Sequence, residues 1–138
     1  MIYQNFNFMM IQKFLLILCP GLTGLTSYVQ PDDIIQGIWR GTSICQVKNS
    51  PCHDETVVYH ITRDTDPKVY QVTMNKIVNQ AEEEMGTIKF IYDPKRESLI
   101  SRDTLRDATW TLNIKDKKMD GTLIYKKQLY RIIQALKD

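Results

Sequence analysis

The amino-acid sequence predicts an all-β domain, an eight-stranded antiparallel meander that closes into a small barrel after an N-terminal signal segment. Three observations predict it: the runs after Ile34 alternate apolar and polar side chains, turn-forming residues separate them, and helical periodicity is lacking. The 138 residues, 43% hydrophobic and 25% charged, suit one globular core. We therefore divide the chain into a signal peptide over 1–27, an arm or tail over 28–33, and a barrel domain over 34–138.

The first part of the chain has the order of features typical of a secretory signal peptide. Lys13 precedes an apolar block from Phe14 to Cys19, and small or turn-forming residues follow it. The block is too short to span a bilayer, which takes about 20 residues, so a permanent transmembrane anchor is the weaker interpretation. Several residues could end the removed segment: Gly21, Thr23, Thr26 and Ser27.

Cys19 leaves a lipid anchor open as an alternative. Bacterial lipoproteins are cut just before such a cysteine, but Leu18 stands where those sites carry a small residue. We therefore expect a periplasmic or secreted protein that meets the membrane through its signal segment or, as the alternative, through Cys19. Removal of the signal leaves Cys45 and Cys52, and an even number of cysteines in an oxidising compartment predicts a disulfide.

Eight β-prone runs follow the signal, and each is bounded by residues that favour turns. The runs cover 34–46, 55–63, 68–77, 86–93, 97–102, 107–114, 119–125 and 128–136. Turn chemistry between them comes from Asn, Asp, Ser and Pro, at Asn49, Ser50, Pro51, Asp64, Asp66, Pro67, Asp93, Pro94, Asp103, Asp107 and Asp116. The stretch from Asn79 to Met85, with three consecutive glutamates, is interpreted as a solvated loop or a single helical turn.

Short connections between consecutive runs favour antiparallel neighbours, because parallel pairing needs long crossovers. Each run has one apolar face: Val57, Tyr59 and Ile61 alternate with His60 in the second run, for example. Closure into a barrel would remove the exposed strand edges. A two-sheet sandwich remains the structural alternative.

The two ends of the domain resemble a known superfamily. The first run contains Gly37 and Trp39 in a Gly-x-Trp pattern, and the last run carries Arg131. This combination resembles the lipocalin and fatty-acid-binding superfamily, the calycins. The resemblance implies that Trp39 closes one end of the barrel and that Arg131 packs across its indole ring as a cation–π partner.

The barrel interior is the candidate binding site. Eight-stranded barrels are just wide enough to be filled by side chains or to hold one small ligand. The small residues Gly41 and Ser43 predict an amphipathic cavity near one mouth, suited to a small apolar or aromatic molecule. The predicted ligand-binding residues are Trp39, Ser43, Tyr59, Tyr70, Phe90, Tyr92, Trp110 and Tyr125.

The densest polar cluster, Cys52 to Glu55, offers a metal site as an alternative to a disulfide-stapled turn. Adjacent residues of an extended chain point to opposite faces, so at most two ligands would converge, and we predict no metal and no cofactor. We expect the Asp54 side chain to form a hydrogen bond with the backbone of the turn. We expect Glu55 to begin the next strand on its solvated side. Catalysis finds little support, because His53 and His60 are the two histidines of the chain and neither joins a catalytic motif.

The charge distribution and the N-terminal arm narrow the functional classes. Eighteen basic and sixteen acidic residues are interspersed, giving a net charge of +2 without the basic stripe that nucleic-acid binding needs. A ligand-binding barrel is our first expectation. The alternatives are a barrel that binds a protein, resembling periplasmic protease inhibitors whose N-terminal arm enters the protease cleft, and a purely structural domain. Residues 28–33 would form such an arm.

Overall fold

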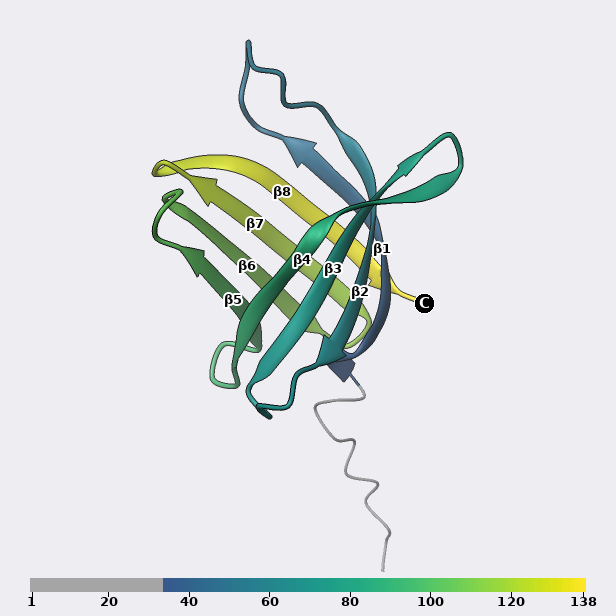
Figure 1. The fold of residues 1–138 in the computed structure, drawn as a ribbon, viewed down its shortest axis with the longest axis vertical. Coiled ribbons are helices and arrows are strands. Elements are labelled where there is room, and N and C mark those ends of the chain that lie inside the picture. Colours follow the sequence, from purple (N-terminus) through teal and green to yellow (C-terminus); the bar gives the residue numbers. More distant parts are fainter. Residues whose placement is uncertain (1–33) are drawn as a thin grey trace, which may run out of the picture.

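The computed structural model of the protein describes residues 34–138. The predicted signal peptide, the arm over 28–33 and the anchor alternative at Cys19 therefore lie outside the described residues. The described part is an all-β closed barrel of eight strands in sequential order, each antiparallel to its neighbours (Figure 1). The predicted fold class is confirmed, and the sandwich alternative is wrong because β1 pairs with β8.

The strands follow the predicted runs closely. Their bounds are β1 Gly37–Cys45, β2 Glu55–Arg63, β3 Val69–Val78, β4 Ala81–Asp93, β5 Ser98–Asp103, β6 Ala108–Lys115, β7 Lys118–Tyr125 and β8 Gln128–Lys137. Three predicted turn residues, Asn49, Asp107 and Asp116, adopt the positive φ angles that Asn and Asp tolerate best. The Asp93 and Asp103 side chains accept hydrogen bonds from backbone N–H groups two residues onward, which closes their turns.

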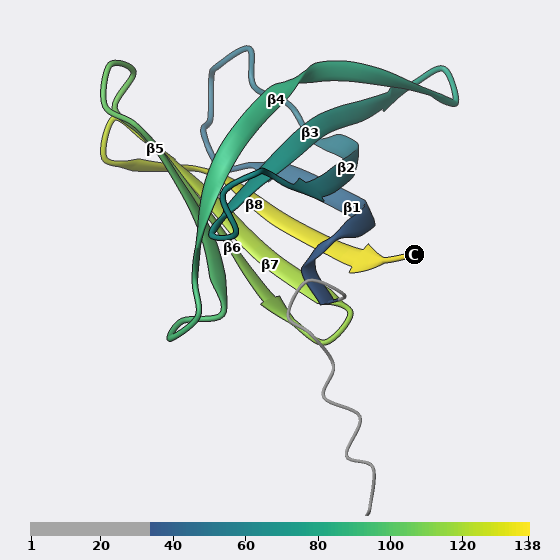
Figure 2. The ribbon, with the colours of Figure 1, turned by 60° about the horizontal axis from the view of Figure 1, so that its bottom comes forward.

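The prediction of a loop or helical turn over 79–85 is wrong. Asn79 and Gln80 form a tight turn with positive φ angles, and β4 already begins at Ala81. The tip of this β3–β4 hairpin projects beyond the barrel, as Figure 2 shows. Both of its faces meet water there, so the glutamates at 82–84 show no apolar alternation although they are paired in a strand.

Antiparallel pairing of β1 with β8 fixes which residues share an end of the barrel. Trp39, near the start of β1, lies opposite Lys137 at the end of β8. Cys45, at the end of β1, lies opposite Arg131 near the start of β8. Trp39 and Arg131 therefore belong to opposite ends of the barrel, which we call the packed end and the open end.

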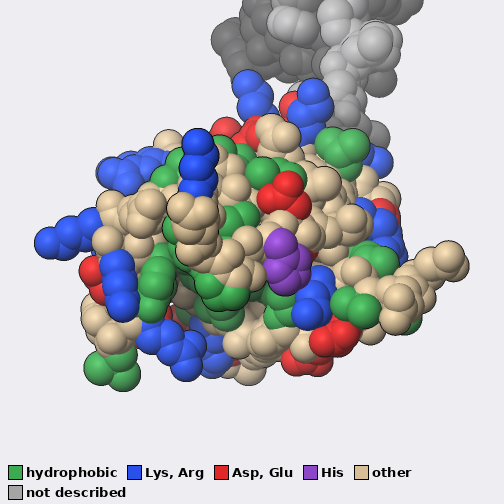
Figure 3. Space-filling model, turned by 90° about the horizontal axis from the view of Figure 1, so that it is seen from above, with side chains coloured by type: hydrophobic (Ala, Val, Ile, Leu, Met, Phe, Trp, Pro, Cys, Tyr) green, Lys and Arg blue, Asp and Glu red, His purple; other side chains and the backbone are tan. Residues whose placement is uncertain are grey.

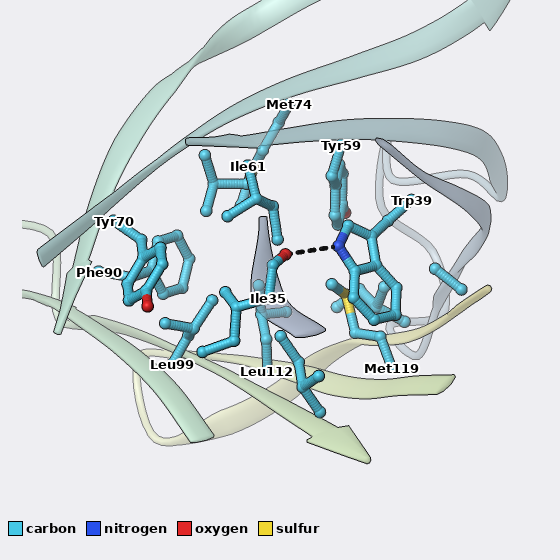
Figure 4. Close-up of a cluster of buried hydrophobic side chains, with 14 of the residues drawn as sticks. Ile35, Trp39, Tyr59, Ile61, Tyr70, Met74, Phe90, Leu99, Leu112 and Met119 are labelled. Atoms are coloured by element: carbon cyan, nitrogen blue, oxygen red, sulfur yellow. Dashed lines mark hydrogen bonds between the residues drawn. The ribbon is translucent and has the colours of Figure 1, made fainter. Parts of the chain in front are cut away.

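Large apolar side chains fill the packed end. Trp39 is fully buried, and its indole N–H donates a hydrogen bond of 2.9 Å to the carbonyl oxygen of Ile35, which precedes β1 (Figure 4). This bond holds Ile35 across the bottom of the barrel, where it is also buried. The other members of this core include Ile61, Tyr70, Phe90, Leu99, Leu112 and Met119.

Candidate functional site

A cavity of about 370 Å³ opens at the other end of the barrel, and we call it the mouth cavity. Residues of seven strands and one residue of the β5–β6 turn line it. They are Ser43, Glu55, Tyr59, Met74, Met85, Gly86, Thr87, Ile88, Arg106, Trp110, Leu123 and Arg131. Viewed from above, this end of the molecule is hollowed, with hydrophobic side chains in the hollow and Lys and Arg side chains on its margin (Figure 3).

The polar wall of the mouth cavity is built around Arg131. Its Nη1 group donates to Ser43 Oγ at 3.1 Å and to the carbonyl oxygens of Ser43 and His53 at 3.3 Å. The same nitrogen forms an ion pair with Glu55 Oε2 at 3.3 Å, and both side chains are only 13% exposed. The wall is thus a nearly buried, charge-compensated cluster rather than a free cation.

The apolar wall faces this cluster. It consists of Met74, Ile88, Leu123 and the half-buried Trp110, with Met85 at the entrance. Thioether and indole groups are polarisable and suit the faces of aromatic molecules. An amphipathic cavity results, with hydrogen-bonding groups on one side and apolar surface on the other.

Gly86 marks the place where β4 opens the cavity. A Cβ atom at this position would meet no atom within 4 Å, so the glycine borders open space. Its φ of +147° is a conformation that other residues rarely adopt, and it lies beside the register shift between Met74 and Asn75. Gly41 acts differently, because a Cβ atom there would clash with the carbonyl oxygen of Gln134. Gly41 therefore lets β1 and β8 approach closely and adds no cavity space.

Tyr59 joins the polar wall from β2. Burial raises the pKa of its phenol, and the positive charge of Arg131 offsets this only in part. The phenol is therefore protonated throughout the physiological range. It is a neutral polar group in the lining of the mouth cavity, hydrogen-bonded to the Ser43 side chain.

The predicted contact between Arg131 and Trp39 is wrong. The resemblance implied that the guanidinium covers the indole, but the register places the two residues at opposite ends of the barrel. Arg131 lies instead 6.0 Å from the ring centroid of Tyr130 and pairs with Glu55. Trp39 is buried at the packed end without it.

The predicted interior residues divide between the two ends. Ser43, Tyr59 and Trp110 line the mouth cavity. The other aromatic residues lie elsewhere: Trp39, Tyr70 and Phe90 are fully buried in the packed core, Tyr92 packs edge-on against Tyr70, and Tyr125 packs edge-on against Tyr130. The predicted ligand set thus mixes residues of the cavity with residues that fill the barrel.

Glu55 is the site residue whose predicted position is wrong. We expected it on the solvated side of β2, yet it lines the mouth cavity and forms an ion pair with Arg131. The signal was present in the sequence, because Glu55 shares its parity with Val57 and Tyr59 on the inward face.

The predicted disulfide between Cys45 and Cys52 is confirmed, with Cα atoms 5.9 Å apart. Asp54 accepts a hydrogen bond from the Cys45 backbone N–H at 2.9 Å, as expected for a stapled turn. A disulfide of this kind is typical of proteins that fold in an oxidising compartment. Over residues 34–138, no group of three or more His, Cys, Asp and Glu side chains is placed to hold a metal ion.

Hollows also lie on the outer surface, and we call one of them the outer groove. It measures about 620 Å³ and lies where β4 and β5 pair over three residues. Its lining combines apolar and polar side chains, among which Ile91 is 62% exposed, and consists of Val69, Lys89, Ile91, Asp93, Arg96, Ile100, Ser101 and Arg102.

Comparison with protein-family models gives no match, and comparison with curated proteins gives none either. The barrel is thus consistent with the lipocalin-like resemblance on topology alone. In the part of the chain that the structure describes, no helix combines the length and apolar character needed to cross a membrane.

Proposed function

We propose that the protein is an exported, lipocalin-like binding protein that holds a small apolar or aromatic ligand in its mouth cavity. The observation that carries the proposal is the cavity itself, about 370 Å³ in volume and bounded by an apolar and a polar wall. Ligand sites of small-molecule binding proteins have volumes of about 300–1,000 Å³ and combine mostly apolar lining with a few fixed polar groups. The role is binding without catalysis.

The mouth cavity suits a ligand better than the larger outer groove does. Its polar groups are held by packing and by mutual hydrogen bonds, with Ser43 2% exposed and Glu55 and Arg131 13% exposed. Pre-organised groups bind without the cost of ordering long side chains. The outer groove is lined by exposed chains such as Lys89 and Arg96, which would have to be ordered on binding.

Export is supported by two features. The order of residues in 1–27 is that of a secretory signal, and the Cys45–Cys52 disulfide indicates an oxidising compartment. In this proposal the ligand is met outside the cytoplasm, in the periplasm or the medium.

A fluorescence titration with N-phenyl-1-naphthylamine, an uncharged probe that brightens in apolar surroundings, tests the proposal. The variant Met85→Trp places a bulky ring at the cavity entrance, and we expect it to weaken probe binding about tenfold or more. The matched control is Ile91→Trp on the same strand, because Ile91 is 62% exposed in the outer groove. We expect this control to bind as the unaltered protein does.

Three results would contradict the proposal. If the unaltered protein did not bind the probe, the proposed ligand-binding function would be contradicted. Loss of binding in the Ile91 variant with retention in the Met85 variant would move the site to the outer groove. Native mass spectrometry of protein purified from its own host adds a third: a protease bound at one-to-one stoichiometry without a retained small molecule would favour the inhibitor alternative.

A further inference from the structure

The charge balance inside the mouth cavity bears on the kind of ligand it accepts. The lining contains two cations, Arg131 and Arg106, and one carboxylate, Glu55. Arg106 lies at the rim, where it is 82% exposed and its charge is screened by water. Asp103 also pairs with it there. The cation inside is Arg131, and Glu55 already neutralises it at 3.3 Å.

An anionic ligand would either compete with Glu55 for Arg131 or bind the guanidinium beside that carboxylate. Displacement of Glu55 would leave its carboxylate charged, 13% exposed and without its cation, which carries a large desolvation cost. The imidazole of His53, whose Nε2 lies 3.9 Å from Glu55 Oε1, is 73% exposed and is a poor substitute for that cation. If the anion did not displace Glu55, it would lie beside that carboxylate and be repelled.

An uncharged ligand meets neither penalty. The four polar contacts of Arg131 with the described residues use Nη1, and none of them uses Nε or Nη2, so these two groups are the candidate donors to a neutral ligand. The protonated Tyr59 phenol adds another neutral donor or acceptor. Carbonyl, hydroxyl or ether groups can therefore be bound while the Glu55–Arg131 pair stays intact.

We infer that the mouth cavity selects uncharged aromatic or apolar molecules over anionic ones of the same shape, and that Glu55 sets this preference. The inference rests on the proposed function, because it names the ligand class of the same cavity. Glu55 acts by occupying Arg131 and by repelling anions, so its removal should convert the cavity into an anion site.

Two probes of matched shape test the inference: N-phenyl-1-naphthylamine, which is uncharged, and 8-anilinonaphthalene-1-sulfonate, which adds one sulfonate to the same skeleton. We expect the unaltered protein to bind the uncharged probe about tenfold or more tightly than the sulfonate. In Glu55→Gln, which keeps the size and an acceptor oxygen, the sulfonate affinity should rise about tenfold, while the uncharged probe changes less than about twofold.

The control variant Asp103→Asn removes one negative charge at the same end of the barrel, from a residue at the rim. We expect the ratio of the two affinities to stay as in the unaltered protein. An equal change of this ratio in Asp103→Asn and Glu55→Gln would overturn the role of Glu55. The preference for uncharged ligands would then come from the overall negative charge at the open end of the barrel.

The outcomes separate the inference from the function on which it rests. Tighter binding of the sulfonate than of the uncharged probe by the unaltered protein would overturn the inference and leave the proposed function standing. This comparison needs no variant, so it decides the matter even if Glu55→Gln does not fold. Binding of neither probe would overturn the proposed function, and the inference with it.

Discussion

The two ends of the barrel are built on the same strands and differ in what fills them. At the packed end, Trp39, Phe90 and Leu112 are fully buried, and a hydrogen bond fixes Ile35 across the bottom. At the open end, Ser43, Glu55 and Arg131 point inward where large apolar chains would otherwise meet. A smaller hollow, of about 250 Å³, lies at the packed end beside Ile35 and Tyr92.

This difference separates stability from binding. A close-packed apolar core gains hydrophobic and dispersion energy and tolerates little change in volume. A cavity forgoes that gain, and a nearly buried ion pair contributes little net stability. The packed end can therefore hold the fold while the open end keeps a hollow with fixed polar groups.

The largest effect is expected at the packed end. Trp39→Ala removes a fully buried ring and should lower the free energy of unfolding by about 3–5 kcal/mol. Chemical denaturation measures it. Trp110→Ala, at the half-buried position in the mouth cavity, should cost less stability and abolish probe binding. Equal losses of unfolding free energy in the two variants would contradict the claim that the packed end contributes more to stability than the open end.

The disulfide is expected to have the next largest effect. Cys45 and Cys52 are seven positions apart, and opening this short loop should lower the free energy of unfolding by about 2.5 kcal/mol on the chain-entropy estimate. The double variant Cys45→Ser/Cys52→Ser, compared with the unaltered protein under oxidising conditions, measures the loss. A reductant should destabilise the unaltered protein by the same amount and leave the variant unchanged.

Removal of Arg131 should have a somewhat smaller effect. Arg131→Met leaves Glu55 nearly buried without its cation, and we expect a loss of about 1–3 kcal/mol in the free energy of unfolding. Arg131→Met combined with Glu55→Gln removes both charges and should recover most of that loss. A double-mutant cycle gives the coupling between the two residues, and additive effects would contradict the pairing.

The smallest effect concerns the β3–β4 hairpin, which Glu82 fastens to the outside of the barrel. Glu82 accepts hydrogen bonds from Asn75 and His60, both at 2.7 Å, and these contacts lower the pKa of its carboxyl group. A carboxyl whose folded-state pKa is lowered contributes stability that is complete above its ordinary pKa of 4.5. That contribution is lost as the pH falls through the folded-state value.

Glu82→Gln should therefore be slightly less stable than the unaltered protein at neutral pH and equally stable in acid. Thermal unfolding measured across this pH range tests the expectation. Glu83→Gln, which changes the neighbouring and more exposed glutamate, serves as the matched control. A difference that persists undiminished in acid would contradict the role given to Glu82.

The sequence was sufficient to predict the strand order and the inward faces of most strands, but not that Trp39, Tyr70 and Phe90 fill one end of the barrel. Alternation and turn residues act locally, so the runs from Val57 to Ile61 and around Trp39 could be assigned without the rest of the chain. The start of β4 was missed because the hairpin tip is solvated on both faces and carries no alternation. The alternation of apolar and polar residues arises because one face of a strand is buried. A strand segment with neither face buried therefore shows no alternation.

The open end was harder to predict because it depends on pairing between distant strands. The position of Arg131 follows from the antiparallel closure of β1 with β8, which sets the start of one strand against the end of the other. The resemblance to calycins instead led to the wrong prediction that Arg131 contacts Trp39. Glu55 was wrongly expected on the solvated side because of its charge, although it shares the parity of Val57, which faces inward.

The two tryptophans of the chain lie at opposite ends of the barrel, and this allows one direct test of the account. Their indole N–H signals can be followed by NMR while N-phenyl-1-naphthylamine is titrated into the protein. We predict that the Trp110 signal shifts to saturation and that the Trp39 signal stays in place. A shift of Trp39 with an unchanged Trp110 would contradict the claim that the open end is the binding site.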